Sequence, residues 1–169
     1  MSGVVAWLTG LPSSGKSTLA AKVAERLRAR DAPCVILDGD EVRARLRPAP
    51  GYDDAGRDAF YATLAGLAGY LASQGAIVLV PATAHLRVFR DRARSLAPRF
   101  VEVFVDTPAE VCMARDAKGL YAAAAQQGNR GSLPGAGALY EPPPSPELRV
   151  HGEEADCDRV VEACLRARA

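Results

Sequence analysis

The stretch from Gly10 to Ser17 has the residue types and the spacing needed to hold a chain of phosphate groups. It reads Gly-Leu-Pro-Ser-Ser-Gly-Lys-Ser and fits the pattern G-x-x-x-x-G-K-[ST]. Glycines at these two positions let successive backbone N–H groups curl around phosphate oxygens at the positive end of a helix, and Lys16 adds a full charge. The hydroxyl after the lysine is a ligand for the magnesium ion that accompanies a nucleoside triphosphate.

Phosphate binding by such a loop requires a strand before it and a helix after it, and the sequence predicts both. An apolar run at residues 4–8 predicts a buried strand before the loop, and residues 16–30 have a helical pattern after it. The alternative is a glycine turn that contains a lysine by chance, and it leaves both flanking elements unexplained. We predict that ATP binds through Gly10, Pro12, Ser13, Ser14, Gly15, Lys16, Ser17 and Thr18, with Ser17 also ligating Mg²⁺.

A second group of charged side chains follows the second apolar run. It reads Asp-Gly-Asp-Glu from Asp38 to Glu41, and Arg43 comes two residues later. Carboxylates at the carboxyl edge of a parallel sheet point into the crevice where ligands bind. In an extended segment, alternation places Asp38 and Asp40 on the same side, facing the metal or a substrate hydroxyl that one of them orients or deprotonates. A solvated acidic turn is the alternative.

Short apolar runs alternate with longer helical patterns along the whole chain. The expected strands are residues 4–8, 34–37, 77–80, 101–105 and, with a weaker pattern, 148–151. The expected helices are residues 16–30, 53–73, 86–97, 108–116 and 154–167, with Thr107 as N-cap of the fourth. This alternation predicts an α/β fold, a three-layer P-loop-type sandwich with five mainly parallel strands and helices on both faces.

The composition favours one ordinary globular domain over residues 1–169. Apolar residues make up 49% and charged residues 24%, which excludes a disordered or fibrous chain. The net charge of +1 gives no overall attraction to nucleic acid or to an anionic membrane, so neither is an expected partner. The four cysteines include no C-x-x-C pair, which favours a reducing cytoplasm over a disulfide framework or a zinc site.

Two further segments each have two interpretations. Arg87, Arg90, Arg92 and Arg94 have the spacing of a surface helix, so we interpret them as a solvated face rather than a nucleic-acid site. Residues 128–146 are rich in glycine and proline, which excludes regular structure there. A segment of this length is either a lid over a site or a surface insertion without function.

The sequence resembles the adenylyl-sulfate kinase family from Trp7 to about Arg149. The resemblance rests on WLTGL at 7–11, LDGDEVR at 37–43, EVFVDTP at 102–108, VC at 111–112, RDAKGLY at 115–121 and YEPP at 140–143. Together these groups are far more specific than the phosphate loop alone. The family transfers the γ-phosphoryl group of ATP to the ribose 3′-hydroxyl of adenosine 5′-phosphosulfate, a step of sulfate assimilation. The resemblance therefore implies this activity, a lid at about residues 118–146 and a homodimer.

The resemblance also implies roles for individual residues. Asp40 would lie near the acceptor hydroxyl and Asp38 near the metal or Lys16, and both join Lys16 as the expected catalytic residues. Arg43 and Arg57 would hold the phosphosulfate end of the acceptor, although an arginine on a helix is often only a solvated side chain. The remaining implied positions are Tyr52, Phe60, Thr83, Ala84, Lys118 and Leu133 around the acceptor and Arg115 near the ATP base.

The chain departs from the family pattern at several of these positions. Glu41 and Phe60 replace asparagines, and Ala84 replaces a serine that has been proposed to carry a phosphoryl group, which leaves direct in-line transfer. In the lid, Leu133 replaces a phenylalanine that would stack on adenine, and alanines at 122–125 replace a basic run, for which Arg130 could restore one charge. His85 replaces a proline and is either a pocket residue or an ordinary histidine at a turn.

These departures keep two other functions open. A kinase of the same family could phosphorylate a hydroxyl of another nucleoside-like compound or specialised metabolite. A regulator that binds ATP without turnover is the other alternative, and Lys16, Ser17, Asp38 and Asp40 argue against it.

Overall fold

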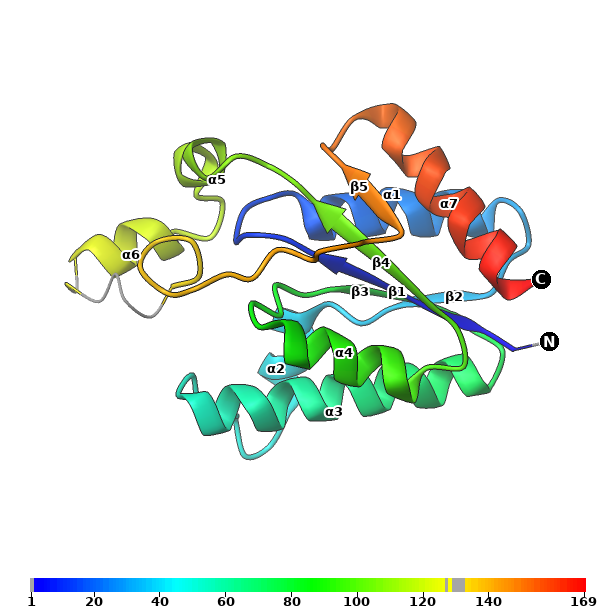
Figure 1. The fold of residues 1–169 in the computed structure, drawn as a ribbon, viewed down its shortest axis with the longest axis horizontal. Coiled ribbons are helices and arrows are strands. Elements are labelled where there is room, and N and C mark those ends of the chain that lie inside the picture. Colours follow the sequence, from blue (N-terminus) through cyan, green and yellow to red (C-terminus); the bar gives the residue numbers. More distant parts are fainter. Residues whose placement is uncertain (1, 127, 129–132) are drawn as a thin grey trace.

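The chain forms a five-stranded parallel sheet with helices packed on both of its faces (Figure 1). The computed structural model describes residues 2–126, 128 and 133–169. The strands are β1 (Val4–Thr9), β2 (Cys34–Ile36), β3 (Ile77–Pro81), β4 (Phe100–Val105) and β5 (Leu148–Val150). The helices are α1 (Lys16–Arg28), α2 (Gly39–Arg45), α3 (Asp54–Ser73), α4 (Arg87–Leu96), α5 (Ala109–Arg115), α6 (Leu120–Gln126) and α7 (Glu154–Arg168). The predicted α/β class is confirmed.

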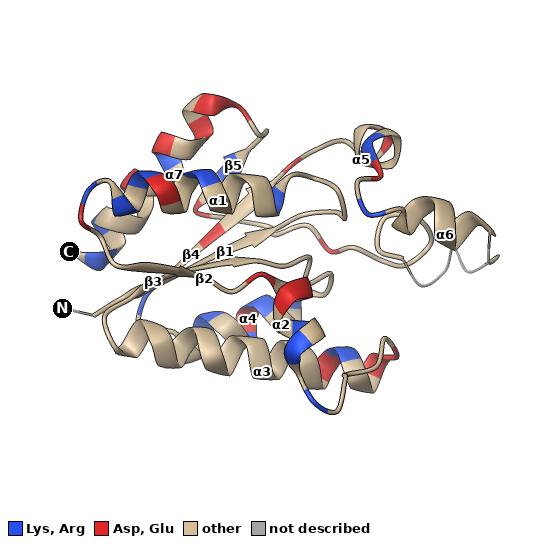
Figure 2. Ribbon diagram, turned by 180° about the vertical axis from the view of Figure 1, so that it is seen from behind, with Lys and Arg blue, Asp and Glu red and all other residues tan. Residues whose placement is uncertain are grey.

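The strand order β2-β3-β1-β4-β5 places β1 at the centre of the sheet. Val5 of β1 is in register with Val78 of β3 and with Phe100 of β4, and every pair of neighbouring strands is parallel. All six residues of β1 are buried, because helices cover both faces of the sheet. The carboxyl ends of the strands therefore meet at one edge, and Figure 2 shows charged residues on α2 and at the start of α3 beside that edge.

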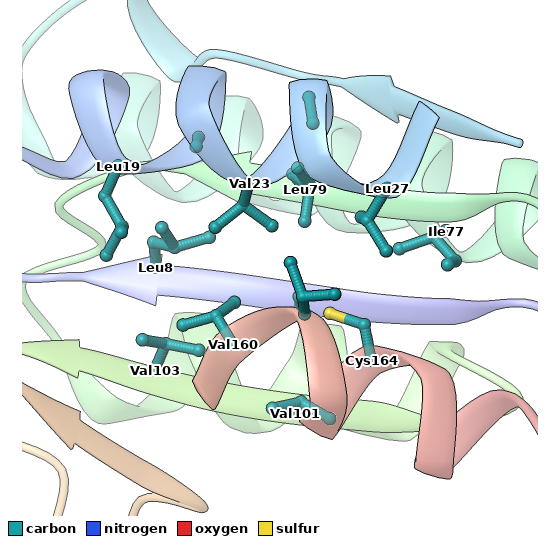
Figure 3. Packing of buried hydrophobic residues seen from close by; sticks show 14 of the residues in the cluster. Leu8, Leu19, Val23, Leu27, Ile77, Leu79, Val101, Val103, Val160 and Cys164 are labelled. Atoms are coloured by element: carbon teal, nitrogen blue, oxygen red, sulfur yellow. The ribbon is translucent and has the colours of Figure 1, made fainter. Parts of the chain in front are cut away.

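Alternate side chains of β1 enter two separate cores. Leu8 packs with Leu19 and Val23 of α1 and with Val160 of α7 on one face, as Figure 3 shows. On the other face, Trp7 packs against side chains of α3 and α4 such as Phe60, Leu64 and Phe89. The two cores fix the position of the loop that leaves β1, because its strand is held from both sides.

Two helices of the structure were not predicted. Helix α2 begins at Gly39, where the Asp38 side chain accepts the N–H groups of Asp40 at 3.0 Å and Glu41 at 3.4 Å. The expectation that Asp38 and Asp40 share one side of an extended segment is therefore wrong. Helix α6 contains the four alanines at 122–125, which are strong helix formers.

Thr107 does not cap α5. Pro108 is the N-cap of that helix, without a side-chain cap, and the Thr107 hydroxyl donates to the Ser14 carbonyl at 2.9 Å. The prediction failed because the hydroxyl of Thr107 forms its hydrogen bond with a backbone carbonyl far away in the sequence and not with the first turn of α5.

The interpretation of α4 as a solvated basic face is wrong at Arg90, which is 2% exposed. Its Nε atom is 2.8 Å from Oε1 of Glu102, while its Nη1 and Nη2 atoms donate to the carbonyls of Ala84 and Glu141 at 2.5 and 2.6 Å. The guanidinium of Arg90 thus connects β4, the turn after β3 and the segment between α6 and β5. Arg92 remains at the surface, paired with Asp58.

The segment after α6 crosses the carboxyl edge of the sheet on its way to β5 (Figure 1). Its described residues form only an isolated bridge between Pro134 and Ala138, which agrees with the predicted lack of regular structure. Glu141 attaches the segment to the turn after β3, since its N–H donates to the His85 carbonyl at 2.8 Å and its carboxylate accepts the Arg87 N–H at 2.6 Å. Arg130 lies outside the described residues. No helix built from the described residues has the length and apolarity to cross a bilayer.

Replacing Arg90 by methionine is expected to lower the free energy of unfolding by about 3 kcal/mol. The buried Glu102 carboxylate then keeps only Arg94, 3.5 Å away, and the carbonyls of Ala84 and Glu141 lose their donor. Arg92→Met, on the same helix but in an exposed pair, is the matched control and should cost less than about 1 kcal/mol. Urea unfolding followed by circular dichroism measures both. Equal losses for the two variants would contradict the stabilising role of the buried pair.

Candidate active site

One cavity of about 1290 Å³ lies at the carboxyl edge of the sheet. Its walls come from the P-loop (residues 10–17), α2, the first turns of α3, the turn after β3 and the lid. The predicted site residues that line it are Pro12, Ser13, Gly15, Lys16, Ser17, Thr18, Asp38, Asp40, Arg43, Tyr52, Arg57, Phe60, Thr83, Arg115, Lys118 and Leu133. Gly10, Ser14 and Ala84 do not line this cavity, and the Ala84 side chain is fully buried.

The P-loop has the backbone shape of an anion site. Gly15 is the N-cap of α1 and has a φ of 96°, a value that favours glycine, and no side chain caps the N–H groups of the first turn. At Gly10 a Cβ atom would lie 2.6 Å from the Val105 carbonyl oxygen, so a side chain would push the loop off β4. These N–H groups thus face the cavity with the positive end of the α1 dipole behind them.

Lys16 folds back into the loop. Its Nζ atom donates to the carbonyl oxygens of Gly10 at 2.9 Å and Leu11 at 2.7 Å. Burial, together with the charge of Lys118, lowers the pKa of Lys16 to about 8. The ammonium group is therefore poorly solvated, and a bound anion would stabilise its charge.

Ser17 and Asp38, the two predicted metal ligands, lie next to each other. The Ser17 hydroxyl donates to Oδ2 of Asp38 at 2.5 Å. Among the described residues, no group of three or more His, Cys, Asp or Glu side chains could hold a metal ion. Two neighbouring oxygen atoms suit Mg²⁺, which takes its remaining ligands from phosphate groups and water in nucleotide sites.

Two hydroxyl groups outside the loop hold its backbone in place. Thr107 donates to the Ser14 carbonyl, and Tyr121 of α6 donates to the Pro12 carbonyl at 3.0 Å. Burial raises the pKa of Tyr121 to about 12, so this hydroxyl remains a donor. The sequence reasoning assigned neither residue to the site, although both lie in the groups of residues that resemble the family. The lid helix is therefore attached directly to the phosphate loop.

Asp40 and Lys118 form an ion pair across the mouth of the cavity. Both side chains are exposed, and they come from α2 and from the base of the lid. Burial acts to lower the pKa of Lys118, but the contact with Asp40 outweighs it and the pKa is raised. The pair thus connects the predicted catalytic carboxylate to the lid.

The guanidinium of Arg43 lies between two aromatic rings. Its Cζ atom is 4.4 Å from the ring centroid of Tyr52 and 4.0 Å from that of Phe60. Nη1 donates to the carbonyls of Pro50 and Gly51 at 3.1 and 3.0 Å. Phe60, which departs from the family pattern, thus contributes a cation–π contact that orients Arg43.

The turn after β3 forms the opposite wall. Thr83 lines the cavity, and its carbonyl accepts the Thr9 hydroxyl at 2.6 Å, which ties the turn to the end of β1. His85 also lines the cavity and packs edge-on against Phe89, with ring centroids 5.5 Å apart. Burial lowers the pKa of His85, and the charge of Arg57 lowers it further, so the ring is neutral at pH 7. His85 is thus both a buried turn residue and a pocket residue.

A smaller pocket of about 260 Å³ adjoins the first one beside the P-loop. It is lined by Ser14, Gly15, Thr18, Leu19, Lys22, Arg115, Gly152 and Cys157. Arg115 lies between the two pockets, and its Nη1 atom would be 3.8 Å from a Cβ atom placed on Gly15. The role of Arg115 near a nucleotide base stays a prediction.

Comparisons with known proteins agree with this geometry. A family model for adenylylsulphate kinase matches residues 2–151. The adenylyl-sulfate kinase of Gloeothece citriformis (strain PCC 7424) is 39% identical over 163 residues, 96% of this chain and 92% of that protein. The adenylyl-sulfate kinase of Synechococcus sp. (strain JA-2-3B'a(2-13)) is 42% identical over 165 residues, 98% of this chain and 94% of that protein. The solved APS kinase CysC of Mycobacterium tuberculosis, in complex with AMPPNP and APS, superimposes with a TM-score of 0.86 at 35% identity, covering 96% of this chain and 95% of that one.

The lowered pKa of Lys16 predicts how triphosphate binding depends on pH. Above about pH 8, Lys16 of the free protein is mostly deprotonated. Binding of the phosphates then requires that Lys16 take up a proton. The Kd of an ATP analogue should therefore rise about 10-fold per pH unit in this range. Lys16→Arg keeps its charge throughout this range and should show no such rise. Calorimetry from pH 7 to 9.5 measures both slopes, and equal slopes would refute the assignment to Lys16.

Proposed function

Because the chain belongs to the adenylylsulphate kinase family, we propose that it phosphorylates the ribose 3′-hydroxyl of adenosine 5′-phosphosulfate with ATP, giving 3′-phosphoadenylyl sulfate. The observation that carries the proposal is a single cavity that contains both the P-loop and the Asp40–Arg43 segment. The Mycobacterium tuberculosis APS kinase CysC, of which this chain covers 95%, was solved in complex with AMPPNP and APS. This arrangement suits transfer between two bound nucleotides.

The donor half of the site binds ATP through its phosphates. The N–H groups of the P-loop and the Lys16 ammonium hold the β- and γ-phosphates, and Thr107 and Tyr121 keep the loop backbone in position. Ser17 and Asp38 hold Mg²⁺, which neutralises charge that develops on the phosphates. Arg115 contacts the nucleotide base near the smaller pocket.

The acceptor half orients the 3′-hydroxyl towards the γ-phosphate. Asp40 accepts the proton of this hydroxyl, and Lys118 exchanges its contact with Asp40 for one with the acceptor. Arg43 and Arg57 bind the phosphosulfate group, and Tyr52 and Leu133 flank the adenine. Ala84 has no hydroxyl and does not line the cavity, so transfer is direct and in line.

The proposal extends to the domain organisation, the oligomeric state and the cellular compartment of the enzyme. Residues 1–169 act as one kinase domain, and the lid at about 118–146 excludes water from the reacting groups. The enzyme works as a homodimer, and sedimentation velocity should give twice the mass of one chain. The cysteines of the described residues are all free, which supports a reducing compartment such as the cytoplasm.

Replacing Asp40 by asparagine tests the proposed mechanism, because it keeps the shape and removes the proton acceptor. The kcat for adenylyl sulfate should fall at least about 100-fold, with little change in the KM for ATP. Glu41→Gln, which removes the neighbouring charge of α2, is the matched control and should retain activity. A coupled assay of ADP release measures both variants. Undiminished turnover by the Asp40 variant would exclude Asp40 as the base.

A further inference from the structure

The hydroxyl of Tyr61 lies on the wall of the cavity and has half of its hydrogen-bonding capacity unused. Tyr61 is in the second turn of α3, is 8% exposed and lines the cavity. Its oxygen accepts the N–H of Ala84 at 3.0 Å. Within the part of the chain that the structure describes, no group accepts the proton of this hydroxyl. Because Tyr61 lines the cavity, its hydroxyl proton is available to a ligand that binds there.

Packing fixes where this hydroxyl points. The Tyr61 ring stacks on Phe89 with centroids 4.6 Å apart and meets Phe60 edge-on at 5.2 Å. Its partner Ala84 has a φ of 42° in a turn that the buried Arg90 also holds. The hydroxyl is therefore held in place before any ligand binds.

The charges around Tyr61 favour an anionic ligand. Arg43 and Arg57 line the same cavity and are close enough to oppose the effect of burial on the pKa of Tyr61. Burial outweighs them and raises the pKa, so the hydroxyl stays protonated and can donate. Among the described residues, Arg43 forms hydrogen bonds only through Nη1, so its Nε and Nη2 atoms can donate to a ligand. One neutral donor next to two guanidinium groups suits a phosphate-like or sulfate-like oxygen.

We propose that the Tyr61 hydroxyl binds the acceptor, donating a hydrogen bond to an oxygen of its phosphosulfate group beside Arg43 and Arg57. This inference rests on the proposed function, since it names a further binding residue for the same acceptor. The hydroxyl that the family pattern carries at position 84 is absent from Ala84, and Tyr61 brings a hydroxyl to the backbone of that residue from a different helix. Tyr61 thereby helps to select acceptors that carry an anionic 5′ group.

A cycle of two proteins and two ligands tests the proposal. Tyr61→Phe removes the hydroxyl and keeps the ring, and adenosine lacks the phosphosulfate group of adenylyl sulfate. The Kd for adenylyl sulfate should rise about 10-fold in the variant, while the Kd for adenosine and the KM for ATP stay unchanged. Tyr70→Phe, on the exposed face of the same helix, is the matched control and should alter none of these values.

The outcomes separate binding from a structural role. If Tyr61→Phe weakens both ligands equally, the hydroxyl only shapes the turn at Ala84, and the proposal is wrong. It is also wrong if neither Kd changes while the wild type turns over adenylyl sulfate, a result that leaves the proposed function intact. A wild type that neither binds nor phosphorylates adenylyl sulfate would overturn both.

Discussion

The burial of the Lys16 ammonium group among backbone carbonyls is the constraint on which the rest of the site depends. A desolvated cation is unfavourable, and here two carbonyl oxygens of the P-loop compensate for only part of the lost hydration. The loop can hold this shape because β1 is packed from both faces of the sheet and ends at a fixed point. Phosphate oxygens would restore the missing interactions, so a loop that holds a lysine with a lowered pKa is suited to bind a triphosphate.

The lid is attached to both halves of the site. Tyr121 of α6 donates to the Pro12 carbonyl, and a Cβ atom on Gly135 would lie 2.6 Å from the Leu11 side chain, so two parts of the lid contact the P-loop. Lys118 at its base pairs with Asp40 of the acceptor half. In the proposed mechanism, an incoming acceptor competes with Lys118 for Asp40, and this exchange links acceptor binding to the position of the lid. The two attachments differ in strength, because the Tyr121 contact with the P-loop is partly buried, whereas the Lys118–Asp40 pair is exposed and screened by solvent.

Local patterns in the sequence were sufficient to predict the sheet, the P-loop and the helices α1, α3, α4, α5 and α7. Each depends on a run of neighbouring residues, such as the apolar residues of β1 or the glycines at 10 and 15. The helix at Gly39 was missed because a seven-residue helix with an Asp N-cap resembles an acidic turn. Arg90 and Tyr61 could not be assigned from the sequence, since their partners lie 12 and 23 residues away and only the fold brings them together.

In the proposed reaction, ATP and the acceptor bind in one cavity, and the γ-phosphoryl group passes from ATP to the acceptor between Lys16 and Asp40. The most direct measurement follows a γ-labelled phosphoryl group of ATP when the enzyme is mixed with adenylyl sulfate and Mg²⁺. We expect ADP and 3′-phosphoadenylyl sulfate that carries the label in its 3′-phosphate. Label released only as inorganic phosphate, at a rate independent of adenylyl sulfate, would contradict it.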